Sequence, residues 1–196
     1  MKARILFAAR ELFAEYGYHG VTTRMIAKEV GIDISTLHYH WGDKENLYEA
    51  VFDDLNDEIE AKLKEIEGIV HGKSLAYRLE VAIDVMCDYL FSNPSVAKLV
   101  MFGHYLKTRS PGASDERLFE QVSNIAIAMG LAPSKNGVSA TANARVLAVS
   151  NAIYSFTAGE PIMRKILRVD HEEYNAVIRD TLKFILIPAF TRETRD

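Results

Sequence analysis

The sequence predicts an all-α protein in two parts, with a three-helix domain over residues 1–47 and a helical bundle over residues 48–196. Apolar residues recur at three- and four-residue spacing through most of the chain, which is the period of an amphipathic helix. No segment shows the apolar–polar alternation of a strand. Glycine, proline and capping residues divide the chain into about nine helices.

Composition indicates a folded globular protein. Of the 196 residues, 48% are hydrophobic and 26% are charged. A net charge of −4 excludes a protein that coats nucleic acid through bulk charge, so any nucleic-acid contact must be local. The only cysteine, Cys87, excludes an intrachain disulfide and fits a reducing compartment. No signal peptide or membrane span is evident, so we expect a cytoplasmic protein without a membrane partner.

The first four helices follow from apolar spacing and from glycine stops. The first ends at Gly17, the second runs from about residue 25 to Gly31, and the third covers residues 34–40. Asp43 begins a fourth helix, which ends near Gly68, because its carboxylate can accept from the amides of the next turn.

The later helices are bounded by caps and turns. Ser74 opens one helix, Pro94 stands at the first position of the next, and Asp170 with Glu173 has capping-box spacing. Turn-rich stretches at 107–114 and 132–137 flank a further helix. The two long helices that follow cover residues 139–158 and 171–187.

Residues 26–37 predict a helix-turn-helix. Ala27 is small enough for the next helix to cross close to its backbone, and Gly31 supplies a left-handed turn. Apolar side chains around them, Leu37 among them, would bury the crossing. In such a motif the second helix projects into the major groove of DNA.

The run LHYHWGDK (37–44) supplies side chains for such contacts. With Leu37 and Trp41 facing inward, the outer face carries donors and acceptors suited to base edges and phosphates: Ser35, Thr36, His38, Tyr39 and His40. Lys44 begins the following helix, where its ammonium and the free amides can converge on one phosphate. Thr23 and Arg24 open the second helix in the same way.

These residues together resemble the N-terminal domain of the TetR family of bacterial repressors. The match runs through Phe13–Gly17, Thr22 or Thr23 to Gly31, Thr36–Trp41 and Lys44–Leu47, and covers roughly residues 3–50. Two positions depart from the family pattern. His38 replaces the usual tyrosine, which puts the operator sequence in doubt, and Trp41 replaces the usual phenylalanine and should fill more core.

The resemblance implies roles for nine residues. Phosphate contacts fall on Thr23, His40 and Lys44, and base contacts on Arg24, Ile34, Ser35, Thr36, His38 and Tyr39. Simpler interpretations stay open: Thr23 as an N-cap, His40 as a histidine at the core edge, and Lys44 as a solvated lysine. Zinc binding by His38 and His40 is disfavoured, because side chains two apart on a helix point about 200° away from each other.

Charge favours a dimer. Residues 1–47 hold six Lys/Arg and six Asp/Glu, so non-specific affinity for DNA should be modest and two domains would be needed.

The helix at 171–187 has an apolar repeat and the one before it is rich in alanine, which suits a four-helix interface between two subunits. The resemblance implies the same homodimer through the last two long helices, and a palindromic operator requires it. An ordinary intrachain core is the alternative.

The segment 75–91 is apolar on more than one face and should lie in the middle of a bundle. The resemblance implies an effector pocket there, for which we select Met86, Tyr89, Phe102, His104 and Tyr105, although each could be plain core. Composition suggests an apolar or aromatic effector with few charges.

The sequence therefore predicts a ligand-responsive transcriptional regulator, most simply a repressor. It would bind a palindromic operator in double-stranded DNA as a homodimer and be released by a small-molecule effector, with no cofactor and no bound metal. A protein-interaction module of the same fold, using DNA as a scaffold, is the alternative. An enzyme built on Asp84, Cys87, Asp88 and His104 is disfavoured, because no motif fixes their geometry.

Overall fold

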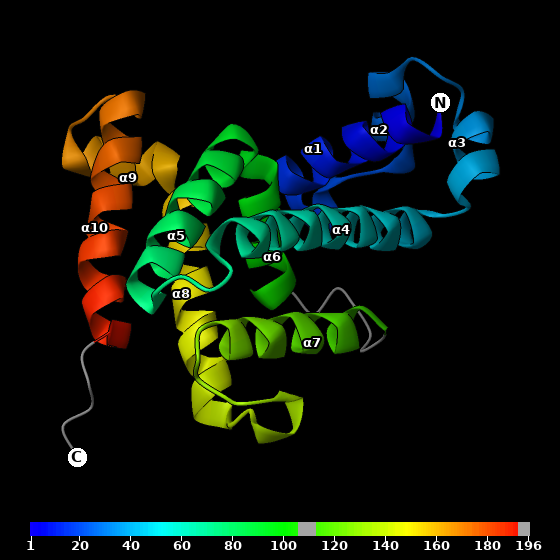
Figure 1. Cartoon of the computed structure of the whole chain (residues 1–196). Coiled ribbons are helices and arrows are strands. Elements are labelled where there is room, and N and C mark those ends of the chain that lie inside the picture. Colours follow the sequence, from blue (N-terminus) through cyan, green and yellow to red (C-terminus); the bar gives the residue numbers. More distant parts are fainter. Residues whose placement is uncertain (106–112, 192–196) are drawn as a thin grey trace. The chain divides into compact units, whose positions relative to one another are not determined.

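The computed structural model describes residues 1–105 and 113–191, with the side chains of residues 104–105 and 113–116 left out of the description (Figure 1). Within these residues all regular structure is helical, in ten α-helices and one 3₁₀ helix, so the all-α prediction is confirmed. No helix in the described part of the chain is long and apolar enough to cross a membrane. The chain divides into two compact units, residues 1–59 with 95–110 and residues 60–94 with 111–196. The boundary predicted between residues 47 and 48 concerns a functional division and stays a prediction.

The first unit is built on aromatic packing around the start of α4. It contains α1 (Lys2–Gly20), α2 (Thr23–Val30), α3 (Ile34–Trp41), the first part of α4 (Lys44–Val70) and α6 (Pro94–Tyr105). The Tyr48 ring lies edge-on to Phe13, Tyr18 and Phe52, with ring centroids 4.8–4.9 Å apart. These contacts bring α1 and α4 together, because edge-to-face aromatic pairs add to the apolar area that they bury.

Helix ends in this unit follow the predicted signals. Gly17, with φ 68° and ψ 170°, interrupts α1, although the chain continues in helical turns to Gly20. Gly31 closes α2 in the left-handed conformation. The Asp43 carboxylate accepts from the Asn46 amide at 2.8 Å and so caps α4, as predicted.

The second unit packs α10 (His171–Thr191) along α5 (Leu75–Ser92). Helix α5 buries one of its apolar faces, at Leu79, Ile83, Met86 and Leu90. Lys183 donates to Asp84 at 2.8 Å, and Arg179 donates to Asp88, so ion pairs join the same two helices at their edge. The unit also holds the second part of α4, α7 (Ala113–Ala128), a 3₁₀ helix (Lys135–Gly137) and α8 (Ala140–Ala158).

One helix of the second unit is absent from the sequence-based expectation. Helix α9 (Glu160–Leu167) links α8 to α10, and Arg168 ends it in a left-handed conformation with φ 59°. Pro161 lies in its first turn, where proline is tolerated because the amide there has no helical partner. The predicted turn at 107–114 lies mostly outside the described residues.

The left-handed turn at Gly31 generates a stability prediction. An added Cβ would meet no atom within 4 Å, so Gly31→Ala is penalised by its φ of 74° alone. We expect a loss of about 1–2 kcal/mol in the free energy of unfolding, measured by urea titration. Gly68, which also has open space around it but lies in helical backbone, is the control: Gly68→Ala should stabilise by up to about 1 kcal/mol. Equal effects of both changes would contradict the conformational argument.

Candidate nucleic-acid interface

The α2–α3 corner is fixed by a cap, a turn and a buried crossing. Thr22, and not Thr23, caps α2, because its hydroxyl accepts from the Met25 amide at 3.2 Å. The interpretation of Thr23 as the N-cap is therefore wrong: it is the first residue of α2 and is half-buried. After Gly31, the Ile32 amide returns to the Ala27 carbonyl at 2.9 Å. Ala27 is buried, which confirms the close crossing predicted at this position.

Helix α3 buries a single side chain, that of Leu37. Ser35, His38 and Tyr39 are exposed, and Ile34, Thr36 and His40 are half-buried. The Tyr39 ring is 85% exposed and lies 5.3 Å from the His40 ring, centroid to centroid. The exposed imidazole of His38 and phenol of Tyr39 bury little area against the helix-turn-helix, so both side chains are available to bind a partner.

The imidazole of His38 is oriented by its own helix end. Its Nδ1 pairs with the Gly42 carbonyl, which can only accept, so Nδ1 carries the proton in the neutral ring. Nε2 is then an acceptor. Such a group can read the exocyclic amine of adenine or cytosine in the major groove.

Lys44 fastens the start of α4 to the segment that follows the Gly17 break. Its Nζ donates to the Tyr18 carbonyl at 3.0 Å and to the Val21 carbonyl at 3.1 Å, and it lies 4.0 Å from the Tyr18 ring centroid. An ammonium has three donors. Two of them bond to carbonyls, so a phosphate contact through the third is compatible with this structural role. The interpretation of Lys44 as a plain solvated lysine is wrong.

Trp41 fills less core than expected. Its ring is half-buried, and the Lys2 ammonium lies 4.9 Å from its centroid. Arg24, by contrast, is exposed on α2. Sequence reasoning missed Lys2, because no local spacing rule relates residue 2 to residue 41.

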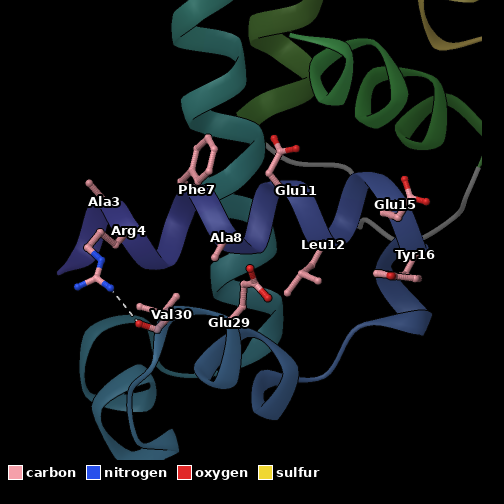
Figure 2. Close-up of a pocket in the computed structure, with 10 residues that line it drawn as sticks. All are labelled: Ala3, Arg4, Phe7, Ala8, Glu11, Leu12, Glu15, Tyr16, Glu29 and Val30. Atoms are coloured by element: carbon pink, nitrogen blue, oxygen red, sulfur yellow. Dashed lines mark hydrogen bonds between the residues drawn. The ribbon is translucent and has the colours of Figure 1, made fainter. Parts of the chain in front are cut away.

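The charged side chains of the first unit differ in their surroundings. Arg10 is only 7% exposed and its guanidinium lies 2.7 Å from Glu58, so it adds little to the surface charge. Three carboxylates, those of Glu11, Glu15 and Glu29, line a groove of about 690 Å³ formed by α1 and α2 (Figure 2). The zero net charge of residues 1–47 is thus unevenly distributed.

The five effector-pocket residues are only partly described. Met86 is buried and Tyr89 half-buried, both on α5, and Phe102 is half-buried on α6 of the first unit. The side chains of His104 and Tyr105 lie outside the description. The pocket therefore stays a prediction.

Three of the four residues considered for an enzyme are buried or ion-paired, and the side chain of His104 lies outside the described residues. Burial raises the pKa of the Cys87 thiol to about 11, which keeps it protonated and unreactive near neutral pH. Asp84 and Asp88 are held by Lys183 and Arg179. Among the described residues, no group of three or more His, Cys, Asp or Glu is placed to hold a metal ion.

Comparison with known proteins supports the DNA-binding interpretation. Residues 5–51 match the family described as bacterial regulatory proteins, tetR family. The transcriptional regulator UidR of Escherichia coli K12 is 39% identical over 69 residues, which cover 35% of this chain and 35% of UidR. The transcriptional repressor AcnR of Corynebacterium glutamicum is 42% identical over 50 residues, covering 26% of this chain and 27% of AcnR. These alignments span about a third or less of the relatives' length.

Solved structures extend the likeness of fold to nearly the whole chain. AibR in complex with isovaleryl coenzyme A and operator DNA has a TM-score of 0.72 at 17% identity, with 95% of this chain and 98% of AibR covered. FadR of Bacillus subtilis in complex with stearoyl-CoA has a TM-score of 0.64 at 17% identity, with 95% and 98% covered. At these identities the likeness establishes the fold.

The two hydrogen bonds of Lys44 predict a loss of stability on its removal. Lys44→Met should lower the free energy of unfolding by about 2 kcal/mol, because charge-assisted hydrogen bonds and a cation–π contact disappear together. Urea unfolding followed by circular dichroism measures the loss. Lys28→Met, at an exposed position of α2, should stay within about 0.5 kcal/mol of the parent. If both variants unfold at the same urea concentration, the hydrogen bonds of Lys44 to Tyr18 and Val21 do not stabilise the fold.

Proposed function

We propose that the chain, whose residues 5–51 match the TetR family of bacterial regulatory proteins, is a ligand-responsive transcriptional repressor acting as a homodimer on a palindromic operator. The exposure of the polar face of α3, a helix whose only fully buried side chain is that of Leu37, carries the proposal. The name of AcnR, a repressor, favours repression over activation. Acting on chromosomal DNA, the protein would work in the cytoplasm.

The proposed contacts divide into two classes. Thr23, His40 and Lys44 bind phosphates, which position the domain without reading sequence. Arg24, Ile34, Ser35, Thr36, His38 and Tyr39 face the base edges. The acceptor Nε2 of His38 and the exposed phenol of Tyr39 would let α3 discriminate between bases.

Exposed apolar side chains support dimerisation through α8 and α10. Leu147 lies on α8, and Val177, Phe184 and Ile185 lie on α10, all exposed. Phe184 is 80% exposed, which is costly for an aromatic ring that remains in water. A second copy of the chain would cover this surface and place two α3 helices for the two halves of a palindrome.

The proposed effector is a small molecule with an apolar or aromatic part, bound near Met86, Tyr89, Phe102, His104 and Tyr105. Two structural neighbours, AibR and FadR, form complexes with acyl-coenzyme A molecules, which favours an acyl chain as the apolar part. The ring of Tyr89 and the buried thioether of Met86 offer adaptable apolar contact for such a chain.

Selection of bound fragments from the source genome, at about 100 mM salt and without added ligand, tests the function. We expect a recurring palindrome with half-sites about one helical turn apart. His38→Ala should then change the preferred bases at particular positions, and Lys44→Ala should weaken binding to all sequences alike. Equal losses on every sequence for both variants would contradict the division of contacts. The absence of any enriched sequence would favour the interaction module.

The dimer surface is tested by Phe184→Glu. This change should convert the dimer into a monomer in sedimentation experiments, because a carboxylate cannot be buried without a partner. Phe119, 64% exposed on α7, supplies the matched control, and Phe119→Glu should leave the dimer intact. Dimers that survive Phe184→Glu would place the subunit contact elsewhere.

A further inference from the structure

Lys2 and Trp41 connect two segments that lie far apart in the sequence. The Lys2 Nζ is 4.9 Å from the centroid of the Trp41 ring, and Trp41 is the last residue of α3. Lys2 is exposed and Trp41 is half-buried. A cation over an indole face is attracted by the ring, while its N–H donors stay available to an anion. The contact therefore holds a positive charge beside α3 without neutralising it.

Three other cations of the same unit are held by partners within the protein. Arg10 is buried against Glu58, the Arg4 guanidinium donates to the Val30 carbonyl at 3.0 Å, and Lys44 donates to two carbonyls. Lys2 has no ion pair within the part of the chain that the structure describes. Its charge is thus more available to an incoming polyanion than that of Arg10.

We propose that Lys2 binds a backbone phosphate of double-stranded DNA, and that Trp41 is the positioning residue that holds it there. The inference rests on the proposed DNA-binding function and adds a contact from outside the helix-turn-helix. Trp41 directly follows His40, to which a phosphate contact is already assigned, so Lys2 supplies charge at the same end of α3. Phosphate is a suitable ligand, because it accepts from an ammonium in many orientations.

The identity of residue 41 fits this role. Among aromatic side chains, the indole attracts a cation most strongly. A phenylalanine at this position would fill the crossing of the helices but would hold the ammonium less well. A tryptophan in place of the family's usual phenylalanine at position 41 would therefore hold Lys2 as well as fill the core.

The salt dependence of DNA binding tests the contact of Lys2. Binding of the full-length protein to a mixed-sequence duplex of about 30 base pairs, and to the selected palindrome, is measured across a salt series. Lys2→Gln should reduce the slope of log K against log salt by about 0.9 for each domain bound, on both duplexes, because a phosphate contact carries no sequence information. Lys2→Arg keeps the charge and should restore the slope.

Lys98→Gln is the matched control. Lys98 also belongs to the first unit, but its ammonium lies 3.0 Å from Glu15, about 20 Å along α1 from Lys2. At that separation salt screens the charge of Lys98 from the Lys2 site, so Lys98→Gln should leave the slope of log K against log salt unchanged. A slope that falls equally in both variants would mean that total charge, and no particular contact, governs binding.

A double-mutant cycle tests the role of Trp41. Trp41→Leu should reduce the slope as Lys2→Gln does, and Lys2→Gln should add nothing in the Trp41→Leu background. Trp41→Phe, which keeps the fold but weakens the attraction, should give an intermediate slope. If the effects of the two residues simply add, Trp41 does not position Lys2. If the parent binds DNA and Lys2→Gln leaves the slope unchanged, only this inference fails; if the parent binds no DNA, the proposed function fails as well.

Discussion

The first unit depends on the crossing of α2 and α3 over Ala27, set by the left-handed turn at Gly31. The Ile32 amide returns to the Ala27 carbonyl, and Leu37 is the single residue of α3 that is fully inserted. Because α3 buries only one side chain completely, we infer that the turn at Gly31 determines its direction more than side-chain packing does. The buried contact of the helix comes from Leu37, so Ser35, His38 and Tyr39 can be exposed.

A second fixed point lies where α4 begins. Lys44 joins the carbonyls of Tyr18 and Val21, and Asp43 caps the helix beside it. The same ammonium is a proposed phosphate contact. Under the proposed function one side chain would serve both stability and recognition. The two carbonyl contacts already offset the desolvation penalty of a lysine at this half-buried position.

Local rules predict most of this fold, and tertiary contacts limit the rest. The bounds of α2 and α3 follow from glycine stops, and the caps at Asp43 and Asp170 lie within three residues of their partners. Helix α9 is short and has Pro161 in its first turn. From the sequence alone, such a proline indicates a helix break unless its place in the first turn is known. The contacts of Lys44 with Tyr18 and of Lys2 with Trp41 depend on how separate helices pack. The spacing of apolar residues along the chain therefore cannot predict them.

The burial of Arg10 against Glu58 bears on how such a protein finds its target. A bacterial chromosome offers about 10⁶ or more competing sites, and every exposed cation lengthens the residence on each of them. If the domain binds DNA as proposed, a buried guanidinium and the carboxylates along α1 would shorten its residence at the wrong sites. Each unproductive encounter would then be briefer, and more molecules would be free to reach the correct site.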